Sequence, residues 1–288
     1  METPGSAQIL VGMLALAALA YIALWVSLER LRSGPQRRPR PWDLVTGFVV
    51  NFFDTLGIGS FAPATAYFKL TQRMPDEQIP GTLNCGNGLP TMTQALIFIA
   101  SVAVDPTTLV SMIGAAVAGA WLGVGIVSRL SKRAIQRGMG GALLIAALLF
   151  LGSNLGWMPG GGTALGLTGA VLGFAVVVNF FLGALMMLGV GLYAPCLILL
   201  SLLGMSPLAA FPIMMGSCGL LMPVGAARFV RTGRYNLGAA VGLALGGIPG
   251  VLVAAYLVRS LPVAWLKWLV TVVVLYAAVQ MLRSARRP

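Results

Sequence analysis

The segment Leu56–Pro63 reads LGIGSFAP, and a second segment, Leu188–Pro195, reads LGVGLYAP. They lie inside the long apolar stretches Trp42–Leu70 and Leu165–Leu203. Glycine weakens a helix through backbone entropy, and proline breaks it because its N–H is missing. Irregular backbone persists in an apolar environment only where protein or a water-filled cavity surrounds it. The two segments therefore predict two interrupted helices inside the apolar part of the fold.

The composition indicates an integral membrane protein. Of the 288 residues, 58% are hydrophobic and only 9% are charged, whereas soluble domains carry about 25% charged residues. The net charge of +12 does not indicate nucleic-acid binding, because the Lys and Arg residues lie between apolar runs rather than along one face.

The sequence offers little for catalysis or metal binding. It has three cysteines and no histidine, and Cys85, Cys196 and Cys218 fall in apolar segments without CxxC spacing. Histidine is the commonest catalytic base and metal ligand, and metal sites and disulfide frameworks need grouped cysteines. We expect no enzyme activity, no metal and no cofactor.

A hydrocarbon core of ~30 Å needs about 20 apolar residues in a helix. The first such window is followed rather than preceded by basic residues, at Arg30–Arg40, so we expect a retained helix and not a signal peptide. The windows run over Ile9–Leu28, Trp42–Leu70, Ile79–Val104, Thr107–Ser128, Met139–Trp157, Leu165–Leu203, Pro207–Val230, Leu237–Val258 and Val263–Leu282.

The basic residues predict how these windows cross. If every window crossed once, Arg129–Arg137 would lie outside, against the positive-inside rule. If each broken window is a re-entrant hairpin, every Lys and Arg except Arg259 and Lys267 lies on the cytoplasmic side. We therefore predict a multi-pass protein of the cell (inner) membrane with its N-terminus outside and its C-terminus in the cytoplasm.

The chain repeats itself around the broken windows. Asn51-Phe52-Phe53 recurs as Asn179-Phe180-Phe181. We expect an all-α membrane protein with an N-terminal transmembrane helix and linker (1–41), a first repeat (42–158) and a second, inverted repeat (159–288). Each repeat would hold a re-entrant broken-helix hairpin plus three transmembrane helices, an arrangement typical of secondary transporters with a midplane site.

The second half of each hairpin would present its N-terminal amides at the membrane centre, which favours an anion. The helix after each hairpin is expected to be broken or polar, over Pro80–Thr91 and Pro212–Gly219. Tight helix packing is the alternative role for the glycines, and inter-helix hydrogen bonding for the polar residues. The candidate substrate-binding residues are Gly57, Gly59, Ser60, Pro63, Asn84, Asn87, Thr91, Gly189, Gly191, Tyr193, Pro195 and Ser217.

Asp54 is an acid well inside a predicted membrane segment. A carboxylate there costs about 2.5–3.5 kcal/mol on insertion scales, so it must be protonated, paired or solvated. One hypothesis is that it carries a coupling proton or helps to hold Na⁺. The alternative is a structural role, as partner of an arginine such as Arg228 or as a cap of the helix break.

The run Gly47–Gly59, which includes NFFD at Asn51–Asp54, resembles the sulfite exporter TauE/SafE family of permeases, as do Gly81-Thr82 and the series Gly173–Leu282. The resemblance implies a bacterial-type inner-membrane permease for sulfite, organosulfonates and related sulfur-containing or carboxylate anions. It also places the family's glycine-rich interrupted segments on residues 57–63 and 189–195. This chain departs from the commonest glycine run at Ile58, Ser60, Val190 and Leu192.

We therefore expect a secondary transporter of small anions that works by alternating access, with the bilayer as its surroundings and a proton or Na⁺ as a possible coupling ion. A passive anion channel and a non-transporting membrane scaffold are the alternatives. The sequence contains no GxxxxGK(S/T) motif for ATP binding. The exact substrate, the direction of transport and the oligomeric state stay open at this point.

Overall fold

The computed structural model describes residues 4–30, 38–127, 129–157 and 162–257, together with a few positions near the C-terminus. Every named element in these ranges is helical. The elements are α1 (Pro4–Arg30), α2 (Pro41–Thr55), α3 (Phe61–Leu70), the 3-10 turn η1 (Asp76–Gln78), α4 (Ile79–Ser101), α5 (Pro106–Val127), α6 (Lys132–Asn154), α7 (Gly169–Met186), α8 (Tyr193–Leu202), α9 (Pro207–Thr232) and α10 (Leu237–Leu257).

Both predicted helix breaks are present. The first lies between α2 and α3, where Gly57 and Gly59 have φ of 85° and 88°. These left-handed conformations carry little cost for glycine and are unfavourable for other residues. The second break lies between α7 and α8, where Gly189 has φ of 93°. Helices α2 and α7 therefore end where a glycine turns the chain.

The two breaks share one hydrogen-bonding pattern. In the first, the Ile58 amide donates to the Phe53 carbonyl at 3.2 Å; in the second, the Val190 amide donates to the Leu185 carbonyl at 3.3 Å. When LGIGSFAP is aligned with LGVGLYAP, these donors and acceptors coincide. The sequence repeat is therefore also a repeat of local backbone structure.

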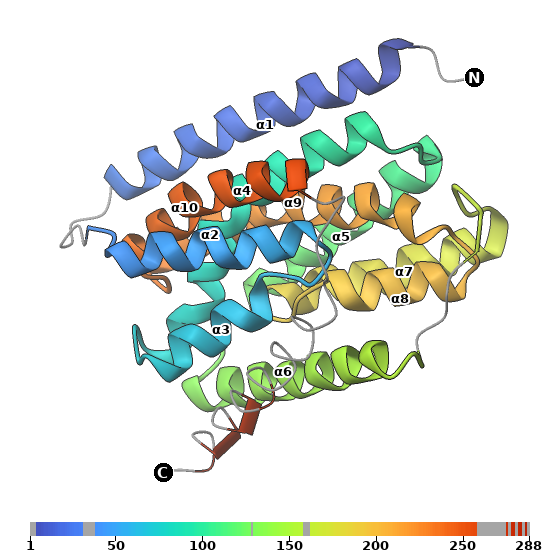
Figure 1. Cartoon of the computed structure of the whole chain (residues 1–288). Helices are drawn as coiled ribbons and strands as arrows, with labels where there is room; N and C mark the ends of the chain where they lie inside the picture. Colours follow the sequence, from blue (N-terminus) through green and yellow to red (C-terminus); the bar gives the residue numbers. More distant parts are fainter. Residues whose placement is uncertain are drawn as a thin grey trace.

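An ion pair closes the base of the first broken segment. Arg73, just after α3, donates from Nε and Nη2 to the two carboxylate oxygens of Asp43, in the first turn of α2, at 2.9 and 2.7 Å. Both side chains are almost fully buried, and the hydrogen bonds to Asp43 raise the pKa of the Arg73 guanidinium. Helix α3 thus returns to the end of the molecule at which α2 begins (Figure 1).

Backbone hydrogen bonds close the base of the second broken segment. The Ser206 amide, after α8, donates to the Ala164 carbonyl, before α7, at 2.8 Å, and the Gly162 amide donates to the Met205 carbonyl at 3.0 Å. This base lies beside the α4–α5 turn, because the Asp105 amide donates to the Leu165 carbonyl at 2.9 Å. The bases of the two segments lie at opposite ends of the bundle (Figure 1).

Helices α4 and α9 pack against each other in the core. Of the two alternatives expected for these helices, broken or polar, the first is absent: α4 continues through Pro90, and α9 continues through Pro212 and Pro223. Neighbouring helices and polar side chains satisfy the backbone groups that a proline leaves free, so a buried helix tolerates it. Their expected polar character is present, since Asn84, Asn87 and Ser217 are fully buried.

A later helix of each half packs along the first helix of the other half. Helix α10 lies along α2, and α5 lies along α7. A Cβ added to Gly246 would lie 2.0 Å from the Leu44 carbonyl oxygen, and one added to Gly119 would lie 1.9 Å from that of Phe180. Small residues let helix backbones approach this closely. Both contacts therefore depend on glycine.

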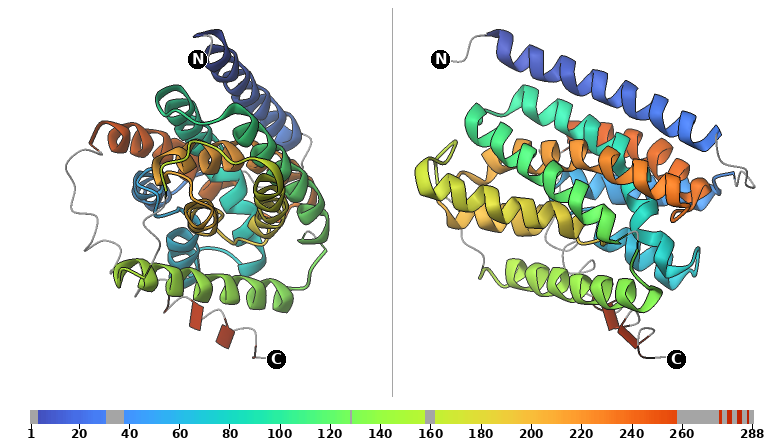
Figure 2. Two further views of the ribbon diagram at one scale, coloured as in Figure 1. Left: turned by 90° about the vertical axis from the view of Figure 1, so that its right-hand side faces the viewer. Right: turned by 180° about the vertical axis from the view of Figure 1, so that it is seen from behind.

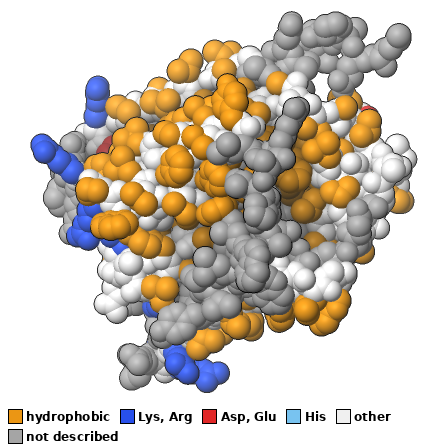
Figure 3. All heavy atoms as spheres, viewed as in Figure 1, with side chains coloured by type: hydrophobic (Ala, Val, Ile, Leu, Met, Phe, Trp, Pro, Cys, Tyr) orange, Lys and Arg blue, Asp and Glu red, His pale blue; other side chains and the backbone are white. Residues whose placement is uncertain are grey.

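Four of the described helices, α5, α7, α9 and α10, are long and apolar enough to cross a membrane. A broad band of hydrophobic side chains covers the face shown in Figure 3, with Lys and Arg side chains toward its edges. Helices α1 and α6 lie on opposite sides of the bundle (Figures 1 and 2). The expected last span, Val263–Leu282, falls outside the described residues apart from isolated positions.

Helix α6 begins at Lys132 rather than near Met139, where the apolar window begins. Lys and Arg are good helix formers, so the helix extends through Arg133 and Arg137. A window defined by apolar residues leaves out Lys and Arg, so the predicted start of this helix was too late.

Candidate functional site

A small cavity of about 40 Å³ lies between the two broken segments. The first segment contributes its break and the first turn of α3, the second contributes the corresponding part of α8, and the peripheral helix α6 completes the lining. The lining residues are Ile58, Gly59, Phe61, Ala62, Val190, Gly191, Tyr193, Ala194, Pro195, Ile145 and Leu149.

The two breaks contact each other reciprocally. A Cβ added to Gly59 would lie 3.9 Å from the Cβ of Tyr193, and a Cβ added to Gly191 would lie 3.6 Å from that of Phe61. In the aligned repeats Gly59 corresponds to Gly191, and Phe61 corresponds to Tyr193. In each broken segment, therefore, the second glycine of the repeat lies next to the aromatic residue of the other segment.

The N-termini of α3 and α8 lie at this cavity. Their first helical hydrogen bonds are donated by the amides of Ala64, to the Ser60 carbonyl at 3.1 Å, and of Cys196, to the Leu192 carbonyl at 3.0 Å. The preceding residues, Pro63 and Pro195, stand in the first turn and have no N–H to lose. The remaining first-turn amides and the positive ends of both helix dipoles favour an anion at this place.

The carboxylate of Asp54 bridges the first break. Its Oδ1 accepts a hydrogen bond from the Ser60 amide, and its Oδ2 accepts one from Nε2 of Gln94 at 2.9 Å. Asp54 is only 2% exposed. This is the capping arrangement considered from sequence, whereas Arg228 lies elsewhere, at the edge of a different pocket. The aligned position of the second half is Met186, so the buried carboxylate belongs to one half alone.

The profile of the sulfite exporter TauE/SafE family matches residues 2–150, which is more than half of the chain. The chain belongs to the TauE/SafE family. The resemblance noted from its motifs is thereby confirmed, and the chain is a membrane protein of a permease family. The match includes the first broken segment and Asp54. Comparisons with curated proteins and with solved structures give no significant match.

In this TauE/SafE permease, Gln94 of α4 joins the two broken segments. Its Oε1 accepts the hydroxyl hydrogen bond of Tyr193 at 2.6 Å, and its Nε2 also reaches Thr55 Oγ1 at 3.1 Å. Gln94 was not among the predicted residues. A signal was available, because Gln94 is a polar residue inside the predicted apolar window Ile79–Val104, directly before the run Ala95–Ala100.

Part of the predicted site of the TauE/SafE chain makes inter-helix contacts instead. Asn51 Nδ2 donates to Asn87 Oδ1 at 2.9 Å, and Asn179 Nδ2 donates to Ser217 Oγ at 3.3 Å. These bonds join α2 to α4 and α7 to α9. Asn87 and Ser217 therefore make inter-helix hydrogen bonds, the role that was the sequence alternative to substrate binding. Neither residue lines the cavity.

The other predicted residues lie around the cavity rather than on it. A Cβ on Gly57 would be 3.0 Å from the Phe211 ring, and one on Gly189 would be 3.0 Å from the Met139 methyl carbon. Asn84 Nδ2 donates to the Pro80 carbonyl at 2.9 Å, within its own helix. Thr91 is fully buried in α4. Gly59, Gly191, Tyr193 and Pro195 are the predicted residues that line the cavity, and Ser60 contributes its amide to Asp54.

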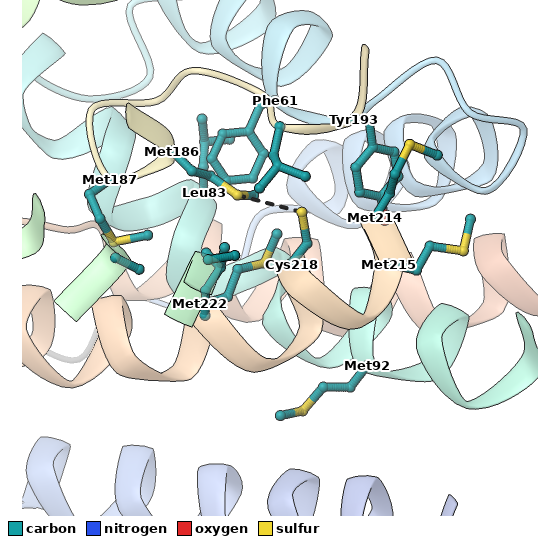
Figure 4. Close-up of a cluster of buried hydrophobic side chains, with 14 of the residues drawn as sticks. Phe61, Leu83, Met92, Met186, Met187, Tyr193, Met214, Met215, Cys218 and Met222 are labelled. Carbon is teal, nitrogen blue, oxygen red and sulfur yellow. Dashed lines mark hydrogen bonds between the residues drawn. The ribbon is translucent and has the colours of Figure 1, made fainter. Parts of the chain in front are cut away.

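Sulfur-containing side chains pack together in the core of this permease (Figure 4). Cys218 Sγ lies 3.5 Å from Met186 Sδ, and both residues are buried. Methionine is flexible and fills irregular gaps, so a core of this kind can repack. Among the residues that the structure describes, no group of three or more His, Cys, Asp or Glu side chains could hold a metal ion.

Proposed function

We propose that this TauE/SafE chain is a secondary transporter of small anions, with sulfite, organosulfonates and related sulfur-containing or carboxylate anions as its substrate class. The observation that carries the proposal is the convergence of two helix N-termini, those of α3 and α8, on one small cavity. Two positive dipole ends and the first-turn amides at one buried place stabilise a negative charge, and no Lys or Arg is among the residues that line the cavity.

The cavity supports recognition of a compact oxyanion. A volume of about 40 Å³ accommodates roughly three water-sized groups at ~10–15 Å³ each, comparable to the oxygens of sulfite. The ring of Tyr193 and the apolar side chains of Ile58 and Val190 shield the site from water, which strengthens each amide contact. A longer organosulfonate requires the two breaks to separate.

We propose that the two broken segments are re-entrant hairpins of an inverted repeat. Their bases lie at opposite ends of the bundle, their hydrogen-bonding patterns coincide, and α2–α10 packing corresponds to α7–α5 packing. In transporters of this architecture, one repeat rocks against the other around a midplane site. Alternating access would then open the cavity first toward the end that holds the α2–α3 base and afterwards toward the other end.

We propose that Asp54 carries the coupling ion, either as a proton or by helping to hold Na⁺. Its carboxylate is buried, has no basic partner in the described part of the chain, and is linked through Gln94 to Tyr193 at the cavity. Neutralisation of the carboxylate changes the hydrogen bonds of the Ser60 amide and of Gln94. The protonation state of Asp54 is thereby connected to the shape of the anion site.

We propose that the end with the α2–α3 base faces the cytoplasm. Asp76 accepts hydrogen bonds from Lys69 at 2.6 Å and from Gln136 of α6 at 2.7 Å, and Arg234 donates to the Leu130 carbonyl at 2.8 Å. The basic segments after α3, α5 and α9 therefore gather at one end, as the positive-inside rule requires of a cytoplasmic side. We also propose an inner-membrane location with the N-terminus outside, because α1 ends at the side of the bundle where α2 begins (Figure 1).

The test is flux into proteoliposomes that contain the purified full chain. Sulfite, a short alkylsulfonate and acetate are offered separately, with and without an imposed pH gradient. We expect saturable flux of sulfite or of the sulfonate that responds to the gradient and supports counterflow. Flux that does not saturate would indicate a channel, and no flux of any of the three anions from folded protein would overturn the proposal.

A further inference from the structure

A groove of about 460 Å³ lies between α1, α5 and α9. Its volume is within the range of about 300–1,000 Å³ that is usual for ligand pockets. Helix α1 lies on the side of the bundle opposite to α6, so the groove is separate from the cavity between the broken segments (Figure 2). The proposed transport mechanism makes no use of it.

Three of the side chains that line the groove are alanines, and α1 is held in place at other points. Ala17 and Ala20 of α1 face it together with Ala227 of α9. Helix α1 is anchored by Tyr21, whose hydroxyl donates to the Cys85 carbonyl at 2.8 Å, and by Trp25, whose Nε1 donates to the Tyr235 hydroxyl at 3.3 Å. These bonds hold α1 against the bundle, where it contacts α4 and α9, next to the groove.

The groove is apolar along its walls and basic at one end. Arg228 and Arg231 line it from the last two turns of α9, and both are exposed. Neither forms an ion pair within the part of the chain that the structure describes, and no Asp or Glu lines the groove. The two guanidinium groups stand one helical turn apart on one face. They offer a positive site next to an apolar trough.

We propose that this groove binds an anionic phospholipid, with one acyl chain along α1, α5 and α9 and the phosphate at Arg228 and Arg231. Guanidinium groups bind phosphate strongly because their N–H groups match its oxygens. Anionic lipids collect in the cytoplasmic leaflet, and basic pockets between helices on that side bind their headgroups. A neutral transmembrane helix would fill the trough but leave both arginines without an anion.

The test uses the purified full chain, delipidated in detergent, and native mass spectrometry. Dioleoylphosphatidylglycerol and dioleoylphosphatidylcholine are added in equal amounts, since they share acyl chains and differ in headgroup charge. We expect phosphatidylglycerol to be retained preferentially, by about tenfold, given the attraction of two basic residues. Equal retention of the two lipids would overturn the proposal.

Variants separate the two parts of the site. Arg228→Gln/Arg231→Gln should abolish the preference for phosphatidylglycerol, whereas the matched pair Arg133→Gln/Arg137→Gln on α6 should leave it unchanged. Ala20→Phe fills the trough without touching either arginine and should lower retention of both lipids. An unchanged preference in Arg228→Gln/Arg231→Gln, or displacement of the lipid by millimolar inorganic phosphate, would refute a lipid site.

Discussion

Tyr193 of α8 donates its hydroxyl hydrogen bond to Gln94 of α4 at 2.6 Å, so that a residue of the second half is held by a side chain of the first. Gln94 is in turn held by Asp54, beside the first break. The three side chains form one continuous path from one broken segment to the other. Separation of the two breaks has to break a bond of this path, which makes it a marker of the closed arrangement.

Tyr193→Phe removes the donor and keeps the ring. A buried acceptor left unsatisfied costs about 1–3 kcal/mol, so we expect a lower thermal midpoint of the detergent-solubilised protein and reduced anion uptake. Tyr67→Phe is the matched control, because Tyr67 of α3 takes no part in the path formed by Asp54, Gln94 and Tyr193. Equal midpoints for the two variants would contradict the role of the Tyr193 hydroxyl.

Asp54→Asn removes the charge but keeps a side chain of similar size that can accept from the Ser60 amide. We expect uptake to lose its response to an imposed pH or Na⁺ gradient while counterflow, which needs only substrate binding, survives. The measurement compares gradient-driven uptake with counterflow in the same proteoliposomes. Uptake that still follows the gradient in Asp54→Asn would exclude this residue as the coupling site.

Gly59 and Gly191 are aligned in sequence but differ in backbone conformation. Gly59 has φ of 88°, whereas Gly191 is not in the left-handed region. Because alanine at positive φ costs ~1–2 kcal/mol, Gly59→Ala should lower the thermal midpoint. Gly191→Ala should fold normally and reduce uptake, since its methyl group enters the cavity beside Phe61. The same loss of stability in both variants would be evidence against this distinction.

Gly119 and Gly125 test the close packing of α5 on α7 within a single helix. A methyl group at Gly119 would lie 1.9 Å from the Phe180 carbonyl oxygen, whereas one at Gly125 would meet nothing within 4 Å. We expect Gly119→Ala to reduce the yield of folded protein sharply. Gly125→Ala should be neutral or slightly stabilising, because alanine is a better helix former by about 1 kcal/mol. Size-exclusion profiles and thermal midpoints distinguish the two outcomes.

The sequence was most informative about local breaks and least informative about distant partners. LGIGSFAP and LGVGLYAP predict both interruptions, because glycine and proline act through their own backbone. It could not predict that α4 runs on through Pro90, since neighbouring helices compensate for the lost hydrogen bond.

The lack of information about distant partners also explains why only part of the candidate site was predicted. The broken segments contain Gly59, Gly191, Tyr193 and Pro195, which do line the cavity. A buried amide serves equally well for ligand binding or for joining helices, and only the position of its partner distinguishes the two. The Asn51–Asn87 bond and the position of Gln94 both depend on how distant segments pack, which no local pattern contains.

The exchange of partners between the halves has a consequence for biogenesis. Helix α2 is covered along its length by α10, and α7 by α5, so the first half leaves the ribosome with two of its faces unmatched. The partners of α2 and α5 become available only when the second half has been synthesised. Neither half therefore reaches its final packing alone.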